Sequence, residues 1–284
     1  MLAQTELAPL TKSEFRQFQE LILAEAGITL NESKHVLVQS RMARRLRALG
    51  LSSYGEYLVH LAGQPPESAE RREMINCITT NKTDFFRENH HFQFLRNRVI
   101  PELRAAAAKG SEKKIRIWSA ACSTGEEPYS IAITIREALG AERNWDVKIL
   151  ASDVDTNVLS TAEAGIYDAE RFQQVEDSML RRYFTRRKTD GALLVNAGLK
   201  QMIRFRRINF VDPAWPIRVS FDVIFCRNVI IYFNRTTQQK LFERLGQYLK
   251  PTGYLLVGHS ENLHWMHHLL VPAGQAIYRL RSPE

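Results

Sequence analysis

The stretch from Ile115 to Tyr129, which reads IRIWSAACSTGEEPY, constrains the fold more than any other part of this chain. A short strand-like run ends in a bend of small residues, and Pro128 then opens a helical pattern. Proline suits the first turn of a helix, where its missing N–H would have no partner in any case. A strand, a turn of small residues and a helix start are typical of a nucleotide-type pocket in α/β folds.

Two glutamates, Glu126 and Glu127, stand at the start of this helix. A diphosphate needs a positive helix start, and two carboxylates there instead suit a ligand that presents hydroxyl groups or a cation. Asp153 follows a second predicted strand, residues 147–151, close to the spacing at which α/β cofactor folds place an acid on a ribose. A helix N-cap is the alternative role for Asp153, but Asp155 can fill it.

The C-terminal part of the chain alternates between predicted strands and helices. Polar residues follow the strands, which is typical of a largely parallel, doubly wound sheet with its ligand at those strand ends. Between residues 165 and 209 the alternation lapses, and residues 193–195 and 202–205 are expected to pair as short antiparallel strands of an insertion. The predicted strands of the main sheet are 115–118, 147–151, 221–226, 254–258 and 276–280.

The first 75 residues show helical spacing and no strand alternation. Residues 11–14, TKSE, resemble a capping box, and Gly27 and Gly50 are expected to end the first two helices. In the second of these helices Val36, Leu37 and Leu46 are expected to turn inward. We therefore expect a helical domain at 1–75, a linker and helix at 76–110, and an α/β domain at 111–284 with a β-subdomain insertion at about 168–207.

A net charge of +8 favours an acidic partner, which could be nucleic acid, anionic lipid or an acidic protein. The clean basic spans are 34–47 and 181–188, and solvated helix faces are the alternative interpretation of both. No apolar run is long enough to cross a membrane, and the N-terminus lacks the order of a signal peptide. Three widely separated cysteines indicate buried free thiols in a reducing compartment, so a cytoplasmic protein is expected.

Five sequence blocks resemble, in order, the hallmark blocks of CheR-type chemotaxis receptor methyltransferases. The resemblance covers nearly the whole chain, including the helical N-terminal part. It implies an S-adenosylmethionine-dependent fold and the transfer of a methyl group to glutamate side chains on the cytoplasmic helical domains of chemoreceptors. We expect a monomer that binds no nucleic acid, holds no metal and does not insert into a membrane. The blocks are TTNKTDFFRE (79–88), WSAACSTGEEPYSIAI (118–133), ASDVD (151–155), FDVIFCRNVIIYF (221–233) and GHSEN (258–262).

The resemblance assigns roles residue by residue. Arg87 and Tyr232 match side chains beside the transferring methyl group, and Arg87 also matches a contact to the methionyl part of the cofactor. The basic face of the second helix becomes a docking site for acid-rich receptor helices. The matching cofactor contacts are Asn81, Thr83, Arg87, Glu127, Asp153, Asn209, Phe210, Arg227 and Asn228, and the docking residues are Arg41, Arg44, Arg45 and Arg47.

Other interpretations of these residues exist. The polar insert 79–84 fits a capped helix break, although the resemblance favours a cofactor contact. A nucleic-acid methyltransferase would share the basic charge and the fold, but it should carry an NPPY-like motif or a cysteine nucleophile, where this chain has CRNVIIYF. A non-catalytic receptor-docking module is a further alternative. The run His264–His268 has no convincing carboxylate or cysteine partner for a metal. The turn at 185–192 is short and cationic, so no requirement for a receptor tether is expected.

Overall fold

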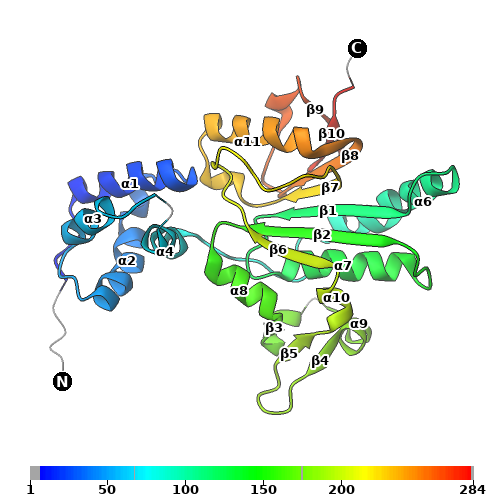
Figure 1. Ribbon diagram of the computed structural model, residues 1–284, viewed down its shortest axis with the longest axis horizontal. Coiled ribbons are helices and arrows are strands. Elements are labelled where there is room, and N and C mark those ends of the chain that lie inside the picture. Colours follow the sequence, from blue (N-terminus) through cyan, green and yellow to red (C-terminus); the bar gives the residue numbers. More distant parts are fainter. Residues whose placement is uncertain (1–6, 67, 174, 283–284) are drawn as a thin grey trace.

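The computed structural model describes residues 7–66, 68–173 and 175–282. Figure 1 shows a bundle of N-terminal helices on one side and an α/β domain on the other, joined by a long extended segment. None of the described helices has both the length and the apolar character needed to cross a bilayer. The predicted fold class, a doubly wound sheet behind a small helical domain, is confirmed.

The N-terminal helices are α1 (Lys12–Ala26), α2 (His35–Leu49), α3 (Tyr54–Ala62) and α4 (Ala69–Ile78). The capping box is confirmed, since the Thr11 side chain and the Glu14 side chain each accept from the other's backbone N–H. Gly27 and Gly50 end α1 and α2 in the left-handed conformation, at φ of 71° and 69°. Val36 was expected to face the core and does not, because only one flank of α2 packs on the other helices and Val36 lies on the outer flank.

A loop of residues 79–89 leads from α4 to a long helical segment made of α5 (His90–Phe94), a π-helical turn (Leu95–Val99) and α6 (Ile100–Ala108). The predicted single helix is thus interrupted by a wider turn. The capped helix break holds in part, since the Thr79 hydroxyl donates to the Asn76 carbonyl at 3.1 Å, near the end of α4. The same hydroxyl and the Asn81 amide also bond outside the two flanking helices, as described below.

The main sheet has seven strands in the order β6-β2-β1-β7-β8-β10-β9. The first five run parallel, whereas β10 and β9 form an antiparallel hairpin edge of which only β10 was expected. The strands are β1 (Lys114–Ala120), β2 (Asp146–Asp153), β6 (Ile203–Arg207), β7 (Phe221–Cys226), β8 (Leu249–Val257), β9 (Leu270–Gly274) and β10 (Ile277–Leu280).

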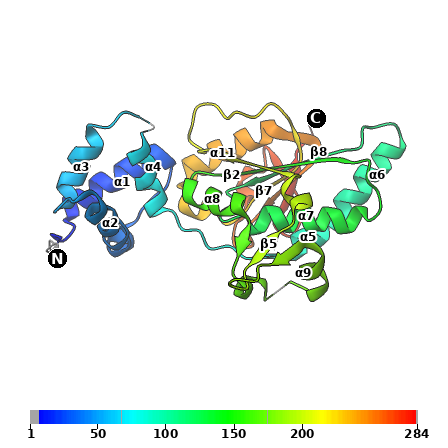
Figure 2. The same cartoon turned by 60° about the horizontal axis from the view of Figure 1, so that its bottom comes forward.

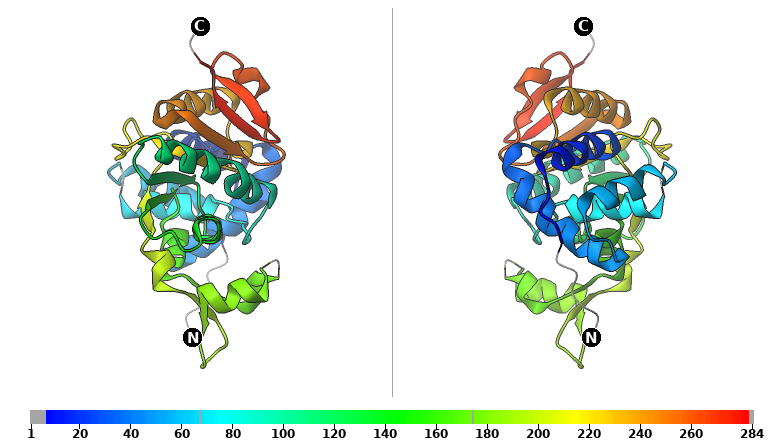
Figure 3. Two further views of the ribbon diagram at one scale, coloured as in Figure 1. Left: turned by 90° about the vertical axis from the view of Figure 1, so that its right-hand side faces the viewer. Right: turned by 90° about the vertical axis from the view of Figure 1, so that its left-hand side faces the viewer.

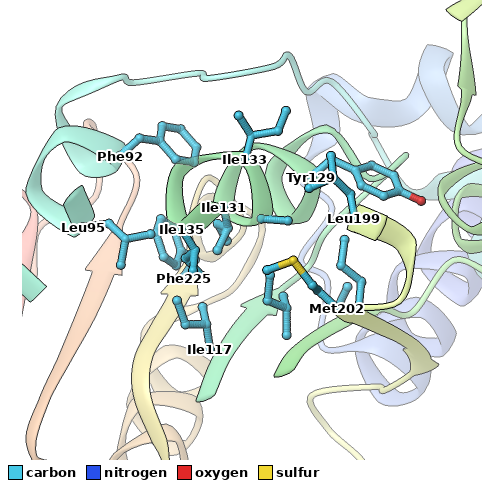
Figure 4. Close-up of a cluster of buried hydrophobic side chains, with 14 of the residues drawn as sticks. Phe92, Leu95, Ile117, Tyr129, Ile131, Ile133, Ile135, Leu199, Met202 and Phe225 are labelled. Carbon is cyan, nitrogen blue, oxygen red and sulfur yellow. The ribbon is translucent and has the colours of Figure 1, made fainter. Parts of the chain in front are cut away.

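Helices cover both faces of this sheet, α7 (Glu126–Leu139) on one and α11 (Arg235–Tyr248) on the other (Figure 1). Successive residues of a strand point to opposite faces. Ile117 therefore packs in the cluster under α7, while its neighbour Trp118 packs in the cluster under α11. Figure 4 shows Ile131 and Ile135 of α7 facing the strands that carry Ile117 and Phe225.

The inserted sheet has a different composition from the one expected. It consists of β3 (Ile166–Tyr167), β5 (Leu193–Val195) and β4 (Phe184–Arg186), and it hangs below the main sheet with α9 (Asp177–Tyr183) beside it (Figures 1 and 3). The predicted pairing of residues 193–195 with 202–205 is wrong. The short helix α10 (Ala197–Lys200) separates the two strands, and β6 continues in parallel along β2, where Ile203 fills the core under α7.

The two domains are joined by backbone contacts. Ile28 forms an antiparallel bridge to Phe233, and the Thr29 N–H donates to the Tyr232 carbonyl at 2.8 Å. The Asn209 side-chain amide donates to the Glu25 carbonyl at 2.6 Å. Figure 2 shows the helical domain set against the same end of the sheet at which the parallel strands terminate. The helical domain therefore covers the edge where an α/β fold places its ligand.

The turn that precedes α7 gives the first prediction. Gly125 has a φ of 99°, and a Cβ atom there would lie 2.8 Å from the Ala162 Cβ and 3.0 Å from its Cα, on helix α8 (Thr156–Ala164). Gly125→Ala should lower the free energy of unfolding by roughly 3 kcal/mol, because backbone strain and a close contact with α8 add together. Gly50→Ala is the matched control, since its φ is also positive but its Cβ would meet nothing within 4 Å. Gly50→Ala should lower the free energy of unfolding, measured by urea denaturation, by only about 1 kcal/mol. Equal losses of stability in the two variants would refute the steric argument.

Candidate active site

A pocket opens between the helical domain and the C-terminal ends of β1, β2 and β7. Its walls include residues of the helical domain, from Ala26 to Leu30 and at Lys34 and Leu37, which the sequence did not point to. The structure brings together every residue that was expected to contact the cofactor or to lie beside its transferring methyl group. These lining residues are Asn81, Thr83, Arg87, Glu127, Asp153, Asn209, Phe210, Arg227, Asn228 and Tyr232.

The turn after β1 forms one wall through its backbone. Ala121 and Ser123 both line the pocket and adopt left-handed conformations, at φ of 68° and 49°. The Ser123 N–H donates to the Asp153 carboxylate at 2.8 Å, and its hydroxyl donates to the Asn81 carbonyl at 3.2 Å. The small side chains of this turn thus let three separate segments approach each other. Positive φ at residues other than glycine is uncommon and concentrates at functional sites.

Asp153 ends β2 at the bottom of the pocket and is almost fully buried. Its carboxylate accepts from the backbone N–H groups of Ser123 and Asp155, the latter at 3.0 Å. Burial outweighs these hydrogen bonds and raises the pKa of Asp153 to about 6. The N-cap role falls to Asp155, as expected, because its side chain accepts from Asn157 at 2.9 Å and Val158 at 3.3 Å. Asp153 is therefore left to face the pocket.

Glu127 and Arg227 form a buried ion pair across the pocket. An Arg227 guanidinium nitrogen lies 3.0 Å from Glu127, and another lies 3.1 Å from Glu88. The Ser119 hydroxyl also donates to Glu127 at 2.6 Å. Although burial opposes it, the Arg227 charge together with hydrogen bonds from His259 and Asn228 lowers the pKa of Glu88 to about 2. Arg227 also donates to the Arg87 carbonyl, so it holds the loop that carries Arg87.

Glu126 does not act as a pair with Glu127, contrary to the sequence-based expectation. Its side chain is fully buried, accepts from the Thr124 hydroxyl at 2.6 Å and lies 3.3 Å from Arg171 of the inserted region. The Tyr167 hydroxyl donates to the Thr124 carbonyl at 2.7 Å from the same region. Consecutive residues of a helix point about 100° apart, so one carboxylate faces the pocket and the other faces the insertion. Glu126 anchors the turn instead of binding the ligand.

The loop of residues 79–89 crosses the pocket and is fixed to the cap of α8. The Asn81 amide and the Thr79 hydroxyl donate to the same Asp155 oxygen at 2.7 and 2.6 Å. Thr83 is buried, and Arg87 is half-buried with one guanidinium nitrogen 2.9 Å from the Lys82 carbonyl. The polar residues of the loop therefore connect it to the sheet and supply part of the pocket wall.

Two carboxylates that sequence reasoning left without a role support the opposite wall. Glu261 is buried and accepts from the backbone N–H groups of Gly258, Asn228 and Ile230 at 2.6, 2.8 and 2.9 Å. Glu88 accepts from the Asn228 side-chain amide at 3.2 Å. Asn228 itself has a φ of 56°, a conformation that these contacts hold in place. Both glutamates lie inside the sequence blocks quoted above. Their place in those blocks was the only signal in the sequence that pointed to them.

The four arginines of α2 lie outside the pocket lining and divide into two kinds. Arg41 donates to the carbonyls of Ile78 and Thr79, both at 2.6 Å, and Arg45 pairs with Glu70, which also accepts from the Tyr57 hydroxyl at 2.8 Å. Arg41 and Arg45 thus hold the helical domain and its linker together. Arg44 and Arg47 are exposed.

The donors and acceptors of the pocket fit S-adenosylmethionine better than a phosphate ligand. A carboxylate at the end of β2 suits ribose hydroxyls, and Ile208, Phe210 and Val154 offer an apolar surface to a purine. The Arg227 Nε is buried without a partner among the described residues, which leaves a donor available at the pocket. Within those same residues no group of three or more potential ligands is arranged to hold a metal ion.

Comparison with known proteins agrees with this geometry. The protein-family model described as "CheR methyltransferase, SAM binding domain" matches residues 81–276. A second family model, described as "CheR methyltransferase, all-alpha domain", matches residues 13–79. "Chemotaxis protein methyltransferase 2" of Pseudomonas aeruginosa is 44% identical over 270 residues, 94% of this chain and 93% of the relative. "Chemotaxis protein methyltransferase" of Escherichia coli is 41% identical over 283 residues, 99% and 95% of the two chains. With both family models matched in order and such identity over nearly its full length, this chain belongs to the CheR methyltransferase family.

Proposed function

We propose that this protein transfers the methyl group of S-adenosylmethionine to glutamate side-chain carboxylates on the helical cytoplasmic domains of chemoreceptors. The products are γ-glutamyl methyl esters, which serve chemotaxis adaptation. The observation that carries the proposal is the single pocket that collects Arg87, Asp153 and Tyr232 in a chain of this family. The basic surface of the protein suits an acidic partner.

The chemistry requires alignment more than acid–base catalysis. A glutamate carboxylate is already ionised near pH 7, so no general base is needed. S-adenosylmethionine, when bound, supplies an electrophilic methyl group on a sulfonium for in-line displacement. The protein contributes orientation of the carboxylate and exclusion of water from it. Arg87 suits an orienting role, and Tyr232 lines the same pocket. A very tight ion pair would blunt the nucleophile, which is consistent with Arg87 being only half-buried.

The cofactor is held, in this proposal, by residues from both sides of the pocket. Asp153 accepts hydrogen bonds from the ribose hydroxyls, and Glu127 provides a second polar contact. Asn81, Thr83 and Arg87 bind the methionyl part. The adenosine side is lined by Asn209, Phe210, Arg227 and Asn228.

A nucleic-acid methyltransferase with a cysteine nucleophile is disfavoured by the state of Cys226. This residue ends β7 with no exposed surface, and burial raises the pKa of its thiol well above the ordinary value. The thiolate is the nucleophilic form of cysteine. Cys226 therefore has neither the access nor the ionisation that such a reaction requires.

Receptor docking is assigned to the exposed arginines of α2. Arg44 and Arg47 present their charges to solvent, whereas Arg41 and Arg45 are engaged in contacts within the protein. A positive stripe next to the pocket steers and aligns an acid-rich helix. The inserted hairpin, in which Arg187 pairs with Asp190 of its own turn, is proposed not to need a receptor tether.

Arg87→Ala tests the proposed reaction together with the assigned role. With labelled S-adenosylmethionine and receptor-bearing membranes, the wild-type protein should produce a base-labile label, as a carboxyl ester must be. Arg87→Ala should lower that turnover at least a hundredfold, because the carboxylate loses its orienting partner. Its thermal unfolding midpoint should stay unchanged. Arg98→Ala, an exposed arginine outside the pocket, should retain activity. A base-stable label would refute the reaction, and normal turnover in Arg87→Ala would refute the role of Arg87.

Asp153 should make cofactor binding depend on pH. Its folded-state pKa of about 6 lies above the ordinary value of 3.8. The ionised form, which accepts from ribose hydroxyls, therefore becomes scarce as the pH falls below about 6. The dissociation constant for S-adenosylhomocysteine should rise about tenfold between pH 7 and pH 5 in calorimetric titrations. Asp153→Asn should bind weakly at every pH without this dependence. A wild-type affinity that stays flat from pH 7 to pH 5 would contradict the assignment.

Charge reversal on α2 should separate docking from folding. Arg44→Glu with Arg47→Glu should raise the KM for receptor about five- to tenfold at low salt, with a smaller effect at 0.5 M salt, where charges are screened. Affinity for S-adenosylhomocysteine and thermal stability should not change. Arg45→Glu should instead lower the unfolding temperature, because it places a second carboxylate beside buried Glu70. Unchanged KM in the double variant would exclude this face from docking.

A further inference from the structure

Two exposed aliphatic side chains, one from each domain, directly precede residues that line the pocket, and they are called the mouth residues below. Val36 and Ile231 are 73% and 57% accessible and belong to the six large apolar side chains that are exposed among the described residues. Val36 stands in the chain between Lys34 and Leu37, which line the pocket, and Ile231 directly precedes Tyr232, which also lines it. One exposed aliphatic residue is ordinary. Two that each directly precede a pocket-lining residue form a candidate contact surface.

The turn that carries Ile231 is fixed by several hydrogen bonds. Glu261 accepts from the Ile230 N–H at 2.9 Å, and the Gln238 amide donates to the carbonyls of Ile230 and Phe233 at 2.9 and 3.0 Å. In this turn Ile230 is buried in the core, Ile231 is exposed to solvent and Tyr232 lines the pocket. An apolar side chain on a backbone that is already ordered loses little entropy when a partner binds to it.

The charges around these side chains define the kind of partner. Lys34, Lys82 and Arg87 line the same pocket. On α2, the spacing of Val36, Ser40, Arg44 and Arg47 places them along one flank, and all four are exposed. An apolar contact with cations on its flanks fits an amphipathic helix that carries acidic residues.

We infer that Val36 and Ile231 are apolar anchors for the receptor helix that carries the acceptor glutamate, an inference that rests on the proposed function. Residues three or four positions apart on a helix have their Cβ atoms about 5–6 Å apart. A glutamate that enters the pocket beside Tyr232 therefore brings the side chain one helical turn away to Ile231, the neighbour of Tyr232 in the chain. The surface selects acceptor glutamates that have an aliphatic residue one turn away.

The test compares Ile231→Ser and Val36→Ser with a matched control, Val59→Ser. Val59 is a valine of α3 with 75% of its surface accessible, and it is not part of the pocket lining. The KM for a purified cytoplasmic fragment of a chemoreceptor, the kcat and the dissociation constant for S-adenosylhomocysteine are measured for each variant. Each mouth variant should raise KM about five- to tenfold, as expected for losing burial of half or more of an aliphatic side chain. The kcat and the cofactor affinity should stay unchanged, and the control should stay within about twofold of wild type.

The outcomes separate this inference from the function on which it rests. Wild-type turnover with unchanged KM in both mouth variants overturns the inference alone. An equal rise in KM for Val59→Ser also overturns it, because the effect would then not depend on the mouth. Absence of a base-labile label with the wild-type protein overturns the proposed function and the inference with it. A second change is made in the receptor fragment, where the aliphatic residue one turn from the acceptor glutamate is replaced by Ser. This change should raise the KM of the wild-type protein, but it should not raise the KM of Ile231→Ser any further.

Discussion

The buried Arg227 charge is the interaction on which the active-site architecture depends. Its side chain is 2% exposed and lies between Glu127 of α7 and Glu88 of the loop that follows α4. A buried charge is tolerated only when it is paired and hydrogen-bonded. Arg227 therefore fixes the end of β7, the start of α7 and the loop carrying Arg87 relative to one another. Glu88 also accepts hydrogen bonds from the Asn228 side-chain amide and the His259 N–H. The ion pair between Arg227 and Glu88 therefore also organises the far wall of the pocket.

The lining of the pocket comes from both domains. The segment from Ala26 to Leu30 closes the pocket and pairs with the chain at Tyr232 and Phe233. Asn209, which was matched to the adenosine side, also donates to the end of α1. In the function proposed above, a receptor helix that docks on α2 contacts an element whose neighbours line the pocket.

Particular residues show where reasoning from the sequence succeeded. The distinction between Asp153 and Asp155 followed from strand and helix signals, because Asp155 stands at a helix start, where it caps α8, and Asp153 ends the strand and lines the pocket. The sequence also indicated the polar loop at Asn81 to Arg87, although only through its resemblance to a family. Glu88 and Glu261 went unnoticed because their partners are backbone N–H groups and side chains from remote segments, as with Glu261 and Asn228. Such partners have no signature in the local pattern.

The sequence by itself determined the doubly wound sheet, the helical domain before it and the pocket residues that lie in the ordered motif blocks, because periodicity, caps and motifs are local properties. The part of the pocket wall that the helical domain supplies emerged only from the tertiary structure. Only the tertiary structure decided which strand β6 would join, since the edge of β2 and the short strand β5 both offered backbone partners. It also decided that Glu126 anchors a turn while Glu127 faces the pocket, and that Arg45 pairs inside its domain while Arg44 faces solvent. Neighbouring residues of like charge are equivalent in the sequence, and the direction in which each points is set by packing between distant segments.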